Sequence, residues 1–303
     1  MTAVLTLDEE MLHGLTPMEE RNGRWYKRDD LLAFSNGVSG KVRTSLWLGR
    51  QAINAGADRL VYGGSVKAPA LGRVASAANY LGLKSTIVIG TDPVRAAERN
   101  PTVAVAAEAG ADFDQAPVAY NPALQKRVRE IVEASNGKAF QVPYGVSAPL
   151  PQKPVDLQRF LEVDGKQVLS LAEAPEVDTL VMSFGSANAA SGVFWGLHTY
   201  PEIAAQLKRV VLVGVGPDKR DWFRDHLRFA GVKLDELGPE IEFLPTYPHF
   251  AQYTDRMPET RDGIDFHELY EGKVVRFLDL LEPDWWTARD GTTCFWIVGG
   301  PLP

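Results

Sequence analysis

The sequence is poor in the residues on which several common kinds of site depend. It has one cysteine, Cys294, in 303 residues, which excludes an intrachain disulfide and a cysteine-rich zinc site and fits a reducing compartment. That cysteine lies in an apolar run, which is typical of a core residue. The five histidines are scattered, with no pair four positions apart, so we expect no metal site. No Gly-x-Ser-x-Gly elbow occurs, and serine or cysteine hydrolysis therefore has no support.

Long apolar runs and basic runs are also missing. No segment approaches the roughly 20 apolar residues that cross a bilayer, and the N-terminus lacks the basic and apolar parts of a signal peptide. The net charge of −7 argues against non-specific binding to nucleic acids or anionic membranes. The sequence predicts a soluble protein of the cytoplasm, long enough for two domains or one large one.

Between residues 42 and 146, helical and strand patterns alternate. The expected helices cover residues 42–55, 71–81, 103–108 and 122–135. Each is followed within two residues by a glycine, the usual end of a helix. The expected strands cover residues 59–62, 85–89, the region of Phe113, and 139–142. Because strands that alternate with helices pair in parallel, this region is predicted to form a parallel α/β sheet.

A second α/β series follows the segment 147–170, which is proline-rich at first and which we interpret as a crossover between two lobes. Its strands are expected at residues 177–183 and 209–216, and its helices at 193–197 and 222–229. The last third of the chain is looser, with many prolines and aromatic residues. The whole pattern predicts an α/β protein.

The segment Gly185–Gly192 has the composition of a phosphate-binding loop. It follows a predicted strand, precedes a helix and contains only small side chains, with hydroxyls at Ser186 and Ser191. Backbone N–H groups at the start of a helix bind anions when the side chains let the anion approach. The alternative is a tight strand-to-helix turn packed against a neighbouring element, and the residues alone favour neither.

Lys41 stands at the start of the first expected helix, directly after Ser39 and Gly40. A lysine in such a place can form an imine with a carbonyl cofactor. The alternative is a solvated residue in the first turn, since most lysines are exposed.

Several segments together resemble one family. They are Tyr26–Leu31, Ser39–Arg43, Gly63–Gly64, Leu81–Val88, Gly185–Gly192 and Phe295–Gly300. In this order they resemble pyridoxal-phosphate enzymes of the tryptophan-synthase-β fold, known as fold type II, in the branch of D-cysteine desulfhydrase and aminocyclopropane-carboxylate deaminase. The Gly-Lys-Val-Arg-Thr and Trp-Ile-Val-Gly sequences resemble divergent phage-encoded members most.

The resemblance implies a two-lobed, three-layer α/β fold with mostly parallel sheets. Residues 1–50 and 151–303 would form the large cofactor-binding lobe, and residues 51–150 the small lobe, with pyridoxal 5'-phosphate in the cleft between them. It also implies a homodimer that acts on a small amino-acid-type substrate, in the host cytoplasm if the protein is encoded by a phage.

The family motifs imply specific roles. Lys41 would form the imine with the cofactor and move the proton at the substrate's Cα. The cofactor phosphate would be held by the start of the loop, namely Gly185, Ser186, Ala187, Asn188 and Ala189. Val298 would lie beside the pyridine nitrogen. Tyr144 and Tyr270 are candidate pocket residues, either of which could position a leaving group.

The sequence also departs from the family. Where the family has Ser-Asn-His, this chain has Lys67, Ala68, Pro69 and Ala70, which are our candidates for the substrate-binding loop. The phosphate loop lacks the family's threonine, and Val298 replaces a threonine beside the ring nitrogen. Lys67 adds a positive charge close to the expected substrate carboxylate or cofactor phosphate; the alternative is a solvated loop lysine.

The resulting interpretation is an enzyme that acts on an amino acid or amino-acid derivative through an α-carbanion, as lyases and deaminases do. The phage-like resemblance suggests a role in the modification of nucleotides or DNA bases. The alternative, which the missing side chains support, is a catalytically silent homologue that serves as a binding module.

Overall fold

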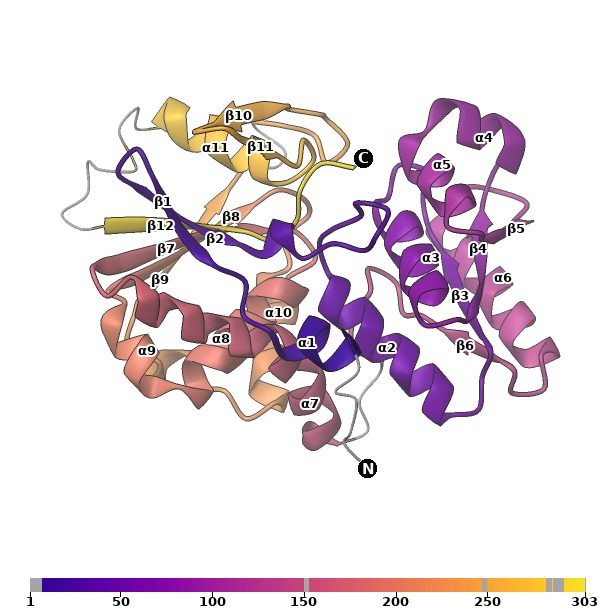
Figure 1. Cartoon of the computed structure of the whole chain (residues 1–303), viewed down its shortest axis with the longest axis horizontal. Coiled ribbons are helices and arrows are strands. Elements are labelled where there is room, and N and C mark those ends of the chain that lie inside the picture. The colour runs from indigo at the N-terminus through magenta and orange to yellow at the C-terminus, as the bar shows by residue number, and fades with distance from the viewer. Residues whose placement is uncertain (1–6, 150–152, 247–249, 282–284, 286–291, 303) are drawn as a thin grey trace. The chain divides into compact units, whose positions relative to one another are not determined.

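The computed structural model describes residues 7–149, 153–246, 250–281, 285 and 292–302, and it falls into two compact units. The first unit contains residues 1–12, 33–150 and 302–303, and the second contains residues 13–32 and 151–301. Residues 33–50, which the sequence analysis assigns to the larger lobe, are therefore part of the first unit. Figure 1 shows the elements of each.

The first unit is built on a four-stranded parallel sheet in the order β5-β4-β3-β6. Its strands are β3 (Arg59–Gly63), β4 (Lys84–Ile89), β5 (Asp112–Gln115) and β6 (Ala139–Gln141). Its helices are α2 (Val42–Asn54), α3 (Ala70–Tyr80), α4 (Pro93–Arg99), α5 (Pro101–Glu108) and α6 (Asn121–Ala134), and α1 (Leu7–His13) begins in this unit. The predicted alternation of helices with parallel strands is confirmed.

Helix α4 is absent from the sequence prediction. Its sequence has no apolar periodicity, and Ala96 is the one buried residue of the helix. The helix depends on its first turn instead, where Asp92 accepts a hydrogen bond from the N–H of Arg95 and Pro93 supplies a suitable φ.

The second unit contains a six-stranded sheet in the order β1-β2-β12-β7-β8-β9. Its strands are β1 (Met18–Arg21), β2 (Arg24–Arg28), β7 (Val177–Phe184), β8 (Arg209–Gly214), β9 (Glu240–Pro245) and β12 (Thr292–Ile297). Only the β1–β2 pair is antiparallel. A separate hairpin joins β10 (Glu259–Arg261) to β11 (Ile264–Phe266). The helices are α7 (Pro154–Gly165), α8 (Asn188–Thr199), α9 (Pro201–Gln206), α10 (Arg220–Phe229) and α11 (Glu271–Leu281), with short 3-10 turns at 29–31, 166–173 and 234–236.

The proline-rich crossover predicted at residues 147–170 is in large part a helix. Pro154 occupies the first turn of α7, where its missing N–H costs nothing, and the helix continues to Gly165. Helix α7 crosses α8 at backbone contact, since a Cβ on Gly196 would lie 2.1 Å from the carbonyl oxygen of Gly165. Gly192 likewise faces Asp164 of α7, so this glycine serves helix packing rather than the loop before α8.

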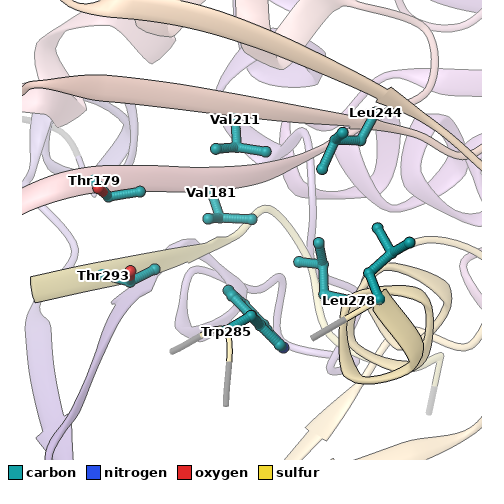
Figure 2. A pocket seen from close by; sticks show the side chains of 8 residues that line it. Thr179, Val181, Val211, Leu244, Leu278, Trp285 and Thr293 are labelled. Carbon is teal, nitrogen blue, oxygen red and sulfur yellow. The ribbon is translucent and has the colours of Figure 1, made fainter. Parts of the chain in front are cut away.

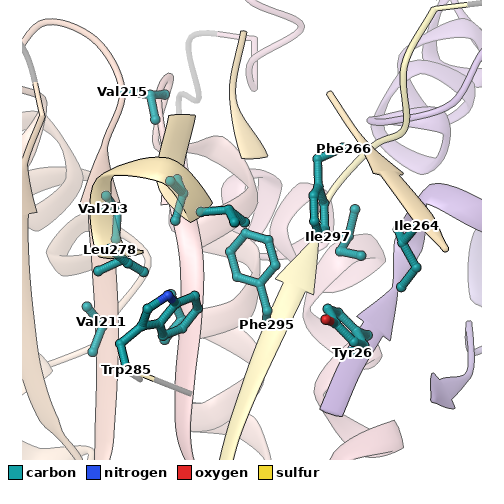
Figure 3. Packing of buried hydrophobic residues seen from close by; sticks show 13 residues of the cluster. Tyr26, Val211, Val213, Val215, Ile264, Phe266, Leu278, Trp285, Phe295 and Ile297 are labelled. Carbon is teal, nitrogen blue, oxygen red and sulfur yellow. The ribbon is translucent and has the colours of Figure 1, made fainter. Parts of the chain in front are cut away.

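One face of the six-stranded sheet carries the main core of the second unit. Val211 of β8 and Phe295 of β12 lie in one apolar cluster with Leu278 of α11 (Figure 3). The same cluster contains Val181 of β7 and Val274 of α11. Helices α8, α9 and α10 lie on the other side of the sheet (Figure 1). This three-layer arrangement with mostly parallel strands confirms the predicted fold class.

The cysteine of the sequence, Cys294, lies in the core of the second unit. Cys294 is fully buried, and burial raises the pKa of its thiol to about 12, which agrees with the expectation of a core residue. Within the described residues, no helix is both long and apolar enough to cross a membrane.

His226 makes the stability of the second unit sensitive to acid. Its ring stacks on Trp222 with 4.2 Å between centroids, and burial lowers the pKa of the imidazole to about 4 from the usual value of about 6.5. Below about pH 6.5 the His226 imidazole is protonated in the unfolded chain but stays neutral in the folded protein, so the free energy of unfolding falls as the pH drops toward about 4. We expect His226→Gln to show a smaller fall in melting temperature between about pH 7 and about pH 5 than the wild type. Equal falls in both proteins would contradict this assignment.

Candidate active site

The turn between β7 and α8 is built from the predicted phosphate loop. Strand β7 ends at Phe184, and α8 begins at Asn188, so only Gly185, Ser186 and Ala187 lie between them. Ala187 has a left-handed backbone with φ 65° and ψ −5°. Its carbonyl oxygen accepts hydrogen bonds from the N–H of Ser191 at 2.8 Å and from the Ser191 hydroxyl at 2.9 Å, which fixes the turn.

This turn has the features of an anion site. A left-handed residue followed by a helical one brings successive N–H groups to one side, and the positive end of the α8 dipole adds to their effect. The first turn of α8 contains no acidic residue, and its side chains are small. The loop is therefore shorter than the predicted Gly185–Gly192, because Asn188 and Ala189 are the first two residues of α8.

Tyr270 lies next to this turn. A Cβ built on Gly185 would be 3.6 Å from Cε1 of Tyr270 and 3.4 Å from Cγ2 of Val215. The ring of Tyr270 also contacts that of His267, with 4.8 Å between centroids. Two candidates from the sequence, Gly185 and Tyr270, thus come together at the carboxyl end of β7, where parallel α/β sheets usually bind their ligands.

Glu271, which was not predicted from the sequence, is a buried acid directly after Tyr270. It is the first residue of α11 and only 1% exposed. Its Oε1 accepts hydrogen bonds from the hydroxyl of Ser183 at 3.2 Å and from the N–H of Val298 at 3.3 Å. The acid therefore lies where β7 and the residue after β12 converge. An acid in the first turn of an amphipathic helix ordinarily faces solvent, where it interacts favourably with the helix dipole. The sequence therefore gives no signal that Glu271 is buried.

In the first unit, Lys41 precedes α2 and has a left-handed backbone with φ 53°. It is partly buried, and its Nζ donates a hydrogen bond to the carbonyl oxygen of Gly145. The N–H of Gly145 in turn donates to the hydroxyl of the buried Tyr62. The segment before the lysine is fixed by Arg73, whose Nε donates to the Ser39 carbonyl oxygen at 2.9 Å.

The other candidates of the first unit lie in two loops. Tyr144 is 51% exposed beside Gly145. Lys67 is exposed, and Ala68 and Pro69 lead from it into α3, which begins at Ala70. The loop is tied to α5 by the Thr102 hydroxyl, which donates to the Val66 carbonyl oxygen.

Backbone strain marks the same segments in both units. Six non-glycine residues of the described chain have a positive φ. Three of them are Asn or Asp, which tolerate this conformation, and the other three are Lys41, Val146 and Ala187. Lys41 and Ala187 are predicted site residues, and Val146 follows the carbonyl that binds Lys41. Strain of this kind, about 1–3 kcal/mol for each residue, is concentrated at functional sites.

The second unit also has an apolar hollow on its sheet. A small hollow on one face of the second sheet is lined by Val181, Val211, Leu278 and Trp285, together with Thr179 and Thr293 (Figure 2). The described residues that line it carry no ionisable side chain. No three His, Cys, Asp or Glu side chains gather closely enough in the described part of the chain to hold a metal ion.

Comparison with solved structures defines the class. The chain is similar to an ACC deaminase homologue, with a TM-score of 0.73 and 23% identity over 96% of this chain and 91% of that one. It is also similar to O-acetyl serine sulfhydrylase isoform 3 of Entamoeba histolytica, with a TM-score of 0.60 and 16% identity over 98% and 88% of the two chains. Maize serine racemase gives a TM-score of 0.57 and 15% identity over 94% and 88%. The chain therefore has the fold of the fold type II pyridoxal-phosphate enzymes.

Among characterised sequences, the chain resembles a phage protein. It is 25% identical to the O-seryl-dTMP PLP-dependent decarboxylase of Salmonella phage ViI. The alignment is 357 positions long and covers 96% of this chain and 82% of the relative. No family model matches the sequence. The predicted resemblance to fold type II enzymes and to phage-encoded members is confirmed.

The strained turn before α8 can be tested by substitution. We expect Ala187→Gly to leave the free energy of unfolding unchanged or to raise it, because glycine adopts a positive φ without a steric cost. Ala187→Val should lower it by at least about 1 kcal/mol, because a β-branched residue is disfavoured in this conformation. Urea unfolding measures both values, and an equal loss in the two variants would show that the turn is not under this constraint.

Proposed function

We propose that the protein is a pyridoxal-phosphate-dependent enzyme that decarboxylates an amino-acid group carried by a thymidine nucleotide. The observation that carries the proposal is the placement of the Glu271 carboxylate. It binds Ser183 and Val298 at the carboxyl end of the sheet that also carries the anion-binding turn. The phage relative, whose name specifies O-seryl-dTMP, supports the choice of substrate.

The residues present fit the cofactor in three respects. The N–H groups of Ala187, Asn188 and Ala189 and the hydroxyl of Ser186 would hold the phosphate. Glu271 would accept a hydrogen bond from the protonated ring nitrogen, a role that the side chain of Val298 cannot fill. Lys41 would hold the aldehyde carbon through its Nζ. When bound, pyridoxal phosphate supplies an electron sink for the pair left on the substrate's Cα.

The loop at Lys67–Ala70 favours decarboxylation. Ala68, Pro69 and Ala70 offer no side-chain hydrogen bond to a substrate carboxylate, whereas Ser-Asn-His would offer several. Lys67 of the same loop is exposed, and we assign it to the solvated side of the loop rather than to the carboxylate. A carboxylate with few hydrogen bonds is poorly stabilised, whereas the neutral CO2 that it becomes loses nothing without them. Such a loop therefore raises the free energy of the substrate relative to the transition state for CO2 loss. In this reaction the bond from Cα to the carboxylate carbon breaks, CO2 leaves with that carbon, and Cα takes up one proton. Lys41 Nζ would deliver that proton.

Elimination or deamination is the second candidate, and Tyr270 is the observation that favours it. Its ring lies beside Gly185, at the edge of the proposed cofactor site. A phenol there could donate a proton to a departing oxygen or nitrogen. The two candidates share the cofactor and Lys41 and differ in the bond that breaks.

Cofactor attachment is the first test. We expect purified protein incubated with pyridoxal phosphate and reduced with borohydride to carry one phosphopyridoxyl group, found by mass spectrometry on the peptide that contains Lys41. The Lys41→Ala variant should carry none, because no other side chain is proposed to bind the aldehyde. Lys84→Ala, which removes an exposed lysine of the same unit, is the matched control and should be labelled like wild type. Labelling at another lysine, or none in the wild type, would refute the proposal and favour a silent homologue.

The reaction itself is tested with O-seryl-dTMP in deuterated water. We expect release of CO2 and a product that retains the nucleotide and carries one deuterium at Cα. Glu271→Gln should keep the cofactor but lower kcat/KM about tenfold or more, because a neutral amide loses a charge-assisted hydrogen bond worth about 1.5–3 kcal/mol. Glu202→Gln, an exposed acid on α9, is the control. Release of the nucleotide with a free hydroxyl in place of its seryl group, without CO2, would replace decarboxylation by elimination.

A further inference from the structure

A partly exposed aromatic ring packs against the residues that follow the carboxyl end of β8. Tyr253 packs against the backbone of Gly216, where an added Cβ would lie 2.8 Å from Cδ2 of the ring and 3.1 Å from Cε2. The side chain nevertheless remains 45% exposed. A side chain at position 216 would displace the ring, and the uncovered part of the ring is accessible.

The segment that carries Tyr253 is pinned to α11. Lys273 is fully buried, and its Nζ donates hydrogen bonds of 2.8 Å to the carbonyl oxygens of both Gln252 and Tyr253. Gly272 lies against the same segment, since a Cβ there would be 2.1 Å from the carbonyl oxygen of Met257. Burial lowers the pKa of Lys273, so holding this ammonium inside the protein has an energetic cost. The position of Tyr253 is thus set by a costly and specific contact.

Tyr253 also lies close to the proposed cofactor site. Gly216, on which the ring rests, is the next residue after Val215, and Val215 is the nearest neighbour of Gly185 in the anion-binding turn. Lys273, which fixes the Tyr253 backbone, stands two residues after Glu271. The ring therefore shares its supports with the turn and with the buried acid.

We propose that Tyr253 is the stacking surface for the pyrimidine base of a nucleotide-linked substrate. This inference rests on the proposed function and specifies how the enzyme selects a nucleotide-borne amino acid over a free one. Aromatic side chains stack on nucleobases, and each such contact is worth about tenfold or more in affinity. A ring that already rests on Gly216 loses less conformational entropy than a free side chain when a base stacks on it.

The experiment uses protein loaded with pyridoxal phosphate and two probes, dTMP and 2-deoxyribose 5-phosphate, which lacks the base. We expect dTMP to bind the wild type more tightly than the sugar phosphate. Tyr253→Leu should lower the affinity for dTMP about tenfold and leave the affinity for the sugar phosphate unchanged. Tyr253→Phe should change neither affinity by more than about twofold, because phenylalanine keeps the aromatic face. Titration calorimetry measures all of these affinities.

The control variant is Phe229→Leu. Phe229 is 42% exposed at the end of α10, a helix that starts after the carboxyl end of β8 and so finishes at the opposite edge of the sheet. It should bind dTMP like wild type. If Tyr253→Leu retains wild-type affinity for dTMP, or loses affinity for both probes equally, the stacking role is refuted even though Lys41 carries the cofactor. Failure of the cofactor to attach to Lys41 would instead refute the proposed function on which the inference rests.

Discussion

The buried carboxylate of Glu271 is the interaction on which the architecture of the second unit's site depends. It joins the first residue of α11 to Ser183 of β7 and to the N–H of Val298 after β12. A charged group with 1% exposure would be costly without such hydrogen bonds. Because those bonds hold α11 in place, they also fix its neighbours on both sides, Tyr270 beside the anion-binding turn and Lys273 beneath Tyr253. One acid thus sets the geometry proposed for the ring, the phosphate and the substrate base.

The first unit follows a comparable logic with different parts. Lys41 has a left-handed backbone and is directed at the carbonyl oxygen of Gly145, while Arg73 holds the Ser39 carbonyl on the other side of Gly40. Gly40 itself has a φ of 78° and lies so close to Arg73 that a Cβ would be 2.5 Å from its guanidinium. The lysine therefore stands on a turn that few other sequences can form, which is the kind of fixed placement that a covalent site requires.

The sequence predicts what local chemistry determines and misses what tertiary contacts determine. Helices that end at Gly56 and Gly82 and the β-branched strand at 85–89 follow from local signals, and the structure confirms them. Helices α4 and α7 were not predicted, because proline usually indicates a loop and here it occupies the first turn of each helix. Glu271 and Tyr253 escaped because a first-turn acid and a loop tyrosine are ordinarily exposed, and only partners far along the chain give them a fixed position.

The central claim is that pyridoxal phosphate binds covalently to Lys41 and through its phosphate to the turn before α8. A crystal structure of the protein grown with pyridoxal phosphate tests it most directly. The account predicts continuous electron density from Lys41 Nζ into the cofactor, with the phosphate within hydrogen-bond distance of the N–H groups of Ala187, Asn188 and Ala189 and the ring nitrogen facing Glu271. A phosphate bound elsewhere, or a cofactor attached to a different lysine, would contradict it.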